Sequence, residues 1–209
     1  MGLSRPGPSG PSVGPNRGGR QRLAWLTLLA ALLVPLPGVA AQDAAPSADV
    51  RLVDASLLDQ DGHALRFATE AVGEHIVAIN FVYTGCTTLC PLTSATFHKV
   101  QGLLKSKPNE DIRLISLSLD PATDTPDRLK DYAARHHAGP GWLWLTGQRA
   151  DVEAVLKGLG AYTPEFRDHP PQVLVGDGRS GQWTRFNSLP APDRIRTELE
   201  RYRASRRHD

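Results

Sequence analysis

The sequence predicts an α/β domain in which a mixed β-sheet is flanked by helices on both faces. Three features support this fold class. Apolar runs typical of buried strands alternate with segments of helical periodicity. Two pairs of short strands, each joined by a glycine-containing turn, lie near the two ends of this pattern. The only two cysteines, Cys86 and Cys90, stand where an apolar strand gives way to a helical segment.

The predicted elements follow one another along the chain without an internal repeat. A hairpin pairs 50–58 with 63–67, because the turn between them contains an Asp-Gly step. Thr125 and Pro126 have the N-cap and first-turn signature of a helix that ends near His137. The other elements, in order, are strand 76–82, helix 87–105, strand 112–119, strand 142–145, helix 149–159, strands 172–175 and 182–186, and helix 191–203. A strand that feeds a helix beginning at paired cysteines is typical of a thioredoxin-like architecture, here with an N-terminal β-hairpin extension.

Composition and charge narrow the classes of partner. The chain has 209 residues, of which 40% are hydrophobic and 22% charged, as expected for one globular domain with an extension. The net charge of +2 depends on arginines that precede residue 43; the rest of the chain has 20 basic and 22 acidic side chains. Aromatic residues are few, at 6%. Nothing in this pattern indicates nucleic acid as a partner.

The N-terminal segment predicts export. Residues 1–22 are rich in glycine, proline and arginine, and an apolar run follows at 23–34. Small residues then precede a cleavage position near Ala41, which is the pattern of a secretory signal. We therefore expect a signal peptide or N-terminal membrane anchor over residues 1–41, a linker at 42–49 and a folded domain at 50–205. The expected location is periplasmic, at the inner membrane if the anchor is retained.

The cysteine pair can either close a disulfide or share a soft metal ion. A disulfide between residues four apart closes a small loop and removes little unfolded-state entropy, so a purely structural role is disfavoured. A thioredoxin-type redox pair has two intervening residues, whereas this pair has three. Two thiolates are too few for a typical structural zinc site but suit Cu(I). The spacing thus favours a functional thiol pair and directs attention to the histidines for a third ligand.

His169 is the best candidate for that ligand, because it lies in an irregular segment just before a predicted strand. The other histidines are expected to be solvated or helix-capping, and Asp120 and Asp124 to serve in turns and capping. Met1 is the only methionine, which excludes copper carriers with thioether ligands and a blue-copper site with an axial methionine. The remaining histidines are His63, His75, His98, His136, His137 and His208.

Three segments together resemble the Sco/SenC family, whose members are exported or membrane-associated thioredoxin-fold proteins that handle copper for cytochrome oxidase. The segments are 80–91 with both cysteines, 115–126 with its Asp-Pro-x-x-Asp-Thr-Pro motif, and Asp168-His169. The resemblance spans roughly residues 50–205. It implies that Cys86, Cys90 and His169 bind copper, as Cu(I), Cu(II) or both, and that Asp168 orients the histidine.

Two positions depart from the family pattern. Thr87 stands where a proline is commoner, which leaves the cysteine loop less rigid. Pro170-Pro171 replaces small hydroxyl residues at the position of the thioredoxin cis-proline, so Pro171 is a candidate for a cis peptide bond and the redox interpretation gains weight.

The favoured hypothesis is a copper metallochaperone rather than an enzyme. It would deliver copper to a binuclear copper site of an exported or membrane cuproenzyme, such as subunit II of cytochrome c oxidase. The alternative is a thiol–disulfide oxidoreductase in which Cys86 and Cys90 reduce the cysteines of such a target, with a thioredoxin-like protein as reductant. A thiol peroxidase is less favoured, because Thr84-x-Cys86 departs from the Thr-x-x-Cys arrangement. Contact with a membrane surface is expected only through the N-terminal segment.

Overall fold

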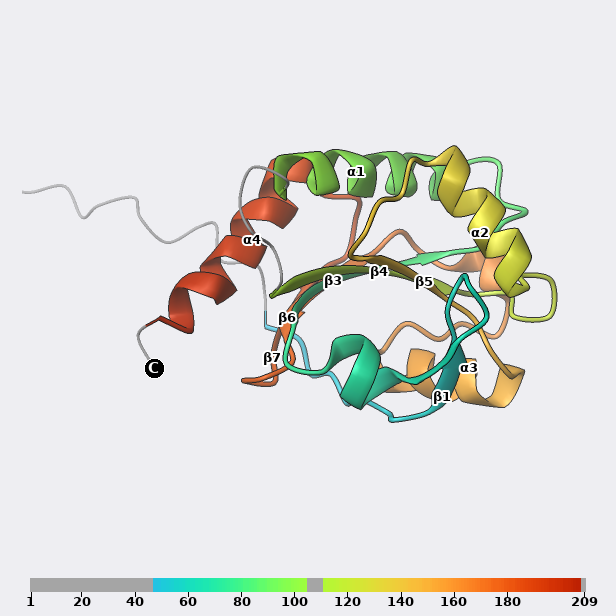
Figure 1. Cartoon of the computed structure of the whole chain (residues 1–209), viewed down its shortest axis with the longest axis horizontal. Coiled ribbons are helices and arrows are strands. Elements are labelled where there is room, and N and C mark those ends of the chain that lie inside the picture. Colours follow the sequence, from blue (N-terminus) through green and yellow to red (C-terminus); the bar gives the residue numbers. More distant parts are fainter. Residues whose placement is uncertain (1–46, 105–110, 208–209) are drawn as a thin grey trace, which may run out of the picture. The chain divides into compact units, whose positions relative to one another are not determined.

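The computed structural model describes residues 47–104 and 111–207 (Figure 1). The described residues all belong to one compact unit. The predicted signal or anchor (1–41) and the first part of the predicted linker therefore lie outside the described residues. Among the residues that the structure describes, no helix combines the length and apolar character needed to cross a membrane.

A five-stranded mixed sheet forms the centre of this unit. Its spatial order is β5-β4-β3-β6-β7. The pairs β3–β4 and β4–β5 are parallel, whereas β6 is antiparallel to both β3 and β7. The predicted mixed sheet is therefore confirmed. The strands are β3 (Ile76–Val82), β4 (Ile112–Ser118), β5 (Trp142–Leu145), β6 (Val173–Asp177) and β7 (Gln182–Phe186).

Helices cover both faces of the sheet (Figure 1). All seven residues of the central strand β3 are buried, and its six apolar residues alternate between two hydrophobic clusters. Ala78 and Val82 pack on one face with helices α1, α2 and α4, whereas Ile79 and Phe81 pack on the other with α3. This burial on both faces explains why β3 is apolar except for Asn80, whose Oδ1 accepts a hydrogen bond from the Ser116 hydroxyl. The helices are α1 (Leu89–Leu104), α2 (Pro126–Arg135), α3 (Arg149–Gly158) and α4 (Pro192–Ser205).

The N-terminal hairpin is present but shorter than predicted. Strands β1 (Ser56–Leu58) and β2 (Ala64–Arg66) form a separate two-stranded sheet. Gly62 in the connecting turn has φ +82°, the left-handed conformation that favours glycine. A π-helical turn, η1 (Phe67–Val72), follows and was not predicted. The Asp54 carboxylate accepts hydrogen bonds from the amides of Ala68 and Thr69 in the first turn of η1. Asp54 is too distant in sequence for a local pattern to reveal this contact.

Three expectations need correction. The end of the predicted linker is not free, because Ser47 bridges Thr184 and the Ala48 amide donates to Trp183 O at 2.8 Å, on the open edge of β7. Helix α1 begins at Leu89 rather than at residue 87, since the preceding residues form the loop that holds Cys86. All peptide bonds in the described residues are trans, so the cis bond considered for Pro171 is absent.

Candidate functional site

The loop that carries Cys86 connects β3 to α1 and is fixed by Asp124. The Asp124 carboxylate accepts hydrogen bonds from the Thr84 amide (3.0 Å), the Thr84 hydroxyl (2.6 Å) and the Ser118 hydroxyl (2.6 Å). Burial raises the pKa of Asp124, although these three donors oppose the rise. The interpretation of Asp124 as a capping residue is therefore wrong: Thr125 caps α2, and Asp124 anchors the cysteine loop at the end of β4.

Cys86 and Cys90 are free thiols that lie next to each other. They are 8% and 6% exposed, respectively. Cys90 occupies the first turn of α1, as predicted, and its amide donates to the Cys86 sulfur at 3.3 Å. The hydroxyl of Thr88 lies 3.8 Å from the same sulfur. The Cys86 sulfur therefore sits where the N-terminal amides of a helix stabilise negative charge.

The two thiols differ strongly in acidity. Burial raises the pKa of Cys86, but hydrogen bonds from the Cys90 thiol, from the amides of Cys90 and Thr88 and from Tyr83 outweigh it and bring that pKa down to about 6. For Cys90, burial and the neighbouring Cys86 raise the pKa to about 12. At neutral pH the site therefore holds one thiolate, on Cys86, and one protonated thiol, on Cys90.

Tyr83 is a site residue that the sequence patterns did not single out. Burial, and then the hydrogen bond to Cys86 and the charges of both cysteines, raise its pKa to about 12. Its ring makes an edge contact with Phe166 at a centroid distance of 5.0 Å. Tyr83 thus joins the Cys86 sulfur to the segment that carries His169. A long-range contact of this kind leaves no periodic signal in the sequence.

His169 follows a short 3-10 turn, η2 (Phe166–Asp168), and its ring packs on Phe81 at a centroid distance of 5.2 Å. Its Nε2 lies 2.9 Å from Nε2 of Gln172. The other amide atom of Gln172, Oε1, accepts from the Arg185 guanidinium at 2.6 Å. Because a guanidinium only donates, the Gln172 NH₂ group must donate to His169, whose Nε2 then carries the lone pair.

The imidazole of His169 is therefore in the right protonation state for a metal ligand, but its Nε2 lone pair accepts a hydrogen bond from Gln172. Burial lowers its pKa, although backbone contacts with Ala161 and Pro170 oppose the shift. A neutral ring binds a metal ion without first losing a proton. The carboxylate of Asp168 is exposed, and the ring's hydrogen bond runs to Gln172. In this structure Gln172 thus holds the orienting position that the resemblance gives to Asp168.

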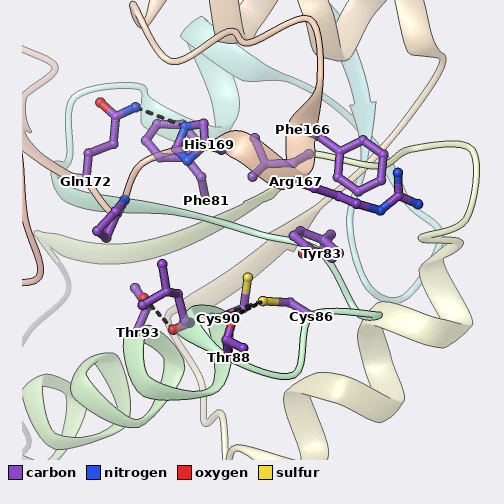
Figure 2. Close-up of a pocket in the computed structure, with 13 residues that line it drawn as sticks. Phe81, Tyr83, Cys86, Thr88, Cys90, Thr93, Phe166, Arg167, His169 and Gln172 are labelled. Atoms are coloured by element: carbon purple, nitrogen blue, oxygen red, sulfur yellow. Dashed lines mark hydrogen bonds between the residues drawn. The ribbon is translucent and has the colours of Figure 1, made fainter.

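Cys86, Cys90 and His169 line one small cavity of about 40 Å³. Figure 2 shows the two sulfurs on one side of this cavity, and His169 with Gln172 on the opposite side. Their three donor atoms do not all lie within 4.8 Å of one another in the described structure. The structure thus brings the predicted ligands to one pocket in an open arrangement. The other lining residues include Leu89, Thr93, Leu119, Phe166, Arg167 and Pro171.

A second group of potential ligands lies at the β1–β2 turn and was not predicted. Donor atoms of Asp59, Asp61 and His63 all lie within 4.8 Å of one another. Asp61 pairs with Lys130 at 2.9 Å, and Asp59 accepts the backbone amides of Asp61 and His63. These contacts account for the cluster as a hydrogen-bonded turn on the surface.

The acidity of Cys86 gives a direct test by alkylation. With iodoacetamide, we expect the modification rate of Cys86 to fall as the pH drops through about 6, because only the thiolate reacts. At pH 7, Cys86 should react at least about a hundredfold faster than Cys90, whose thiol is protonated. Peptide mapping by mass spectrometry at several pH values measures both rates. Equal rates for the two cysteines at pH 7 would contradict the assignment.

Fold and site together define a class: a thioredoxin-like protein with a dithiol at the start of its first sheet-packed helix and a neutral histidine across the pocket. Comparison with known families makes this more specific. The family model described as SCO1/SenC matches residues 51–202, and the chain belongs to the SCO1/SenC family. The resemblance inferred from the cysteine, Asp-Pro and histidine segments is confirmed.

Individual relatives agree with this assignment. The chain is 36% identical over 115 residues to the "SCO1 protein homolog" of Bacillus subtilis (strain 168), a match that covers 53% of this chain and 58% of the relative. The chain spans about half the length of the curated relatives it matches.

Solved structures match over more of the domain. The copper-bound structure of Bradyrhizobium japonicum ScoI has 25% sequence identity and a TM-score of 0.60, covering 73% of this chain and 99% of that one. The structure of BsSco, described as a member of the Sco family of cytochrome c oxidase assembly proteins with a disulfide switch, has a TM-score of 0.64 at 24% identity. It covers 77% of this chain and 97% of its own, and supports the fold.

Proposed function

We propose that this protein is a copper chaperone that binds copper through Cys86, Cys90 and His169. One observation carries the proposal: a thiolate, a thiol and a neutral imidazole with its lone pair on Nε2 line the same small, mostly buried cavity. Soft thiolates with one imidazole are a donor set that suits copper in either oxidation state, and Cu(I) best. Relatives in the same family have been solved with copper bound, which supports the assignment.

The geometry suggests an order of events for copper capture. The Cys86 thiolate binds first, because it is already deprotonated at neutral pH. Cys90 then loses its proton to solvent as its sulfur binds, since a bound metal ion favours the thiolate. His169 completes the site only after Nε2 exchanges its hydrogen bond with Gln172 for copper. Because Gln172 can take back the hydrogen bond to His169, the histidine can leave copper first. Copper can then pass to an acceptor by stepwise ligand substitution.

We further propose that the acceptor is a binuclear copper site of an exported or membrane cuproenzyme, such as subunit II of cytochrome c oxidase. The description of BsSco as a member of a cytochrome c oxidase assembly family supports this choice. The signal-like N-terminal sequence supports an exported, periplasmic protein, which would work where such copper sites are assembled.

A thiol–disulfide oxidoreductase is the second candidate, favoured by the unequal acidity of the two cysteines. The Cys86 thiolate would attack a target disulfide, form a mixed disulfide and release one target thiolate. Cys90 would then lose its proton and displace the second target sulfur, leaving the target reduced and Cys86–Cys90 oxidised. A thioredoxin-like reductant would restore the two thiols. The disulfide switch described for BsSco supports this alternative.

Titration of the reduced full chain with Cu(I), against a chromophoric Cu(I) chelator, tests the chaperone. We expect one ion per chain and a loss of affinity of at least about tenfold in His169→Ala, which removes one of three ligands. Unchanged affinity in His169→Ala, or no binding by the parent chain, would refute the proposed site. An oxidoreductase alone should keep its rate of exchange with a model disulfide in His169→Ala and lose it in Cys86→Ser.

A further inference from the structure

Two histidines outside the cysteine pocket lie close together on the face of the sheet that α1 and α2 cover. His98 is in α1, and His137 lies just beyond the end of α2. Their ring centroids are 5.5 Å apart, with an angle of 55° between the ring planes. No local sequence pattern pairs them, because 39 positions separate the two residues. Their proximity is produced by the packing of α1 beside the end of α2.

The turn that carries His137 is fastened to α1 by the side chain of Gln101. Nε2 of Gln101 donates a hydrogen bond to the His137 carbonyl at 3.2 Å, and Oε1 of Gln101 accepts one from the Gly139 amide at 2.7 Å. Gln101 is 6% exposed, and both of these hydrogen bonds are partly buried. His137 has φ +54°, the one described non-glycine residue with a positive φ. A histidine in this conformation is uncommon and is held there by its surroundings.

One nitrogen of the pair also lacks a partner. Nδ1 of His98 is buried and makes no hydrogen bond within the part of the chain that the structure describes. A buried polar atom without a partner in the protein calls for an explanation, such as an ordered water molecule or a bound ion. An ion held between the two rings would supply that missing partner.

We propose that His98 and His137 form a second metal site, for a divalent transition-metal ion of borderline softness. With metal–nitrogen bonds of about 2.0–2.1 Å, two imidazoles on one ion at a tetrahedral or wider angle have ring centroids about 5–6 Å apart. The observed centroid separation of 5.5 Å lies within this range. The C-terminal end of α2 should strengthen the binding of a cation here, because the C-terminal carbonyls of a helix attract positive charge.

The expected ion is a divalent one, whereas the cysteine pocket suits Cu(I) best. Two imidazoles with water ligands favour Cu(II) over Ni(II) and Zn(II), following the general affinity order of divalent ions. His98 lies eight positions beyond Cys90 on α1, a rise of about 12 Å along the helix. The two sites are thus separate, and each can be removed without deleting a ligand of the other.

Titration with Cu(II) in the full chain, prepared without a histidine tag and with Cys86→Ser and Cys90→Ser, isolates this site. We expect one bound ion with nitrogen hyperfine structure in its electron paramagnetic resonance spectrum. Affinity should fall at least about tenfold in His98→Gln and in His137→Asn, which each remove one imidazole. Asparagine tolerates the left-handed conformation at position 137, and circular dichroism checks that both variants fold.

A matched control separates this site from the acidic turn. His63→Gln removes the imidazole next to Asp59 and Asp61 and should leave Cu(II) affinity within about twofold of the parent. Loss of binding in His63→Gln, or unchanged binding in His98→Gln, would overturn the proposal. Because the cysteines are absent in this experiment, neither result bears on Cu(I) capture at Cys86 and Cys90.

Discussion

Replacing Cys86 with serine should lower Cu(I) affinity by about a thousandfold or more, the largest functional effect that we expect from a single substitution. Cys86 supplies the one thiolate that exists before copper arrives, since its pKa is about 6. A serine hydroxyl is a hard donor that stays protonated near neutral pH, so it provides neither charge nor softness. Competition with a Cu(I) chelator of known affinity measures the change.

Two further variants make this result specific. Cys90→Ser should also weaken binding by at least about a hundredfold, because it too removes a soft ligand. Thr87→Ser, at an exposed position of the same loop, should leave Cu(I) affinity within about twofold of the parent. If Cys86→Ser bound Cu(I) as tightly as Thr87→Ser, the thiolate could not be the primary ligand, and the copper site would have to lie elsewhere.

Replacing Asp124 with alanine should cause the largest loss of stability among the site substitutions. The change leaves the Thr84 amide, the Thr84 hydroxyl and the Ser118 hydroxyl without their acceptor in a buried position. Each unsatisfied buried donor costs about 1–3 kcal/mol, so we expect unfolding free energy to fall by about 3–5 kcal/mol. Chemical denaturation followed by circular dichroism measures it. Cu(I) affinity should fall as well, because Asp124 fixes the cysteine loop.

Asp120→Ala is the matched control for this experiment. Asp120 lies at the same end of β4, but no hydrogen bond of its side chain occurs within the described residues, and its turn is formed by its backbone carbonyl. We expect a change below about 1 kcal/mol, because this half-buried side chain makes no hydrogen bond that the substitution would remove. Equal destabilisation by the two substitutions would mean that the turn, rather than the Asp124 carboxylate, stabilises the loop.

Much of the fold followed from local patterns. The strand at 76–82 was predicted with its observed bounds because burial on both faces favours a nearly continuous apolar run. The start of α2 was equally clear, since Thr125 and Pro126 are a local cap signal. The π-helical turn at 67–72 was missed because Asp54, a distant residue, satisfies its amides. The same limitation hid the pairing of Ser47 with Thr184.

For the candidate site, the sequence by itself was enough to predict the ligands: the dithiol Cys86 and Cys90, and His169 as the favoured histidine. Spacing and placement at a strand–helix junction are local properties, and they are readable without a structure. Only the tertiary structure decided which thiol is ionised, which nitrogen of His169 is free and what holds the loop. Those properties depend on burial and on partners such as Tyr83 and Gln172, which folding brings in from separate segments.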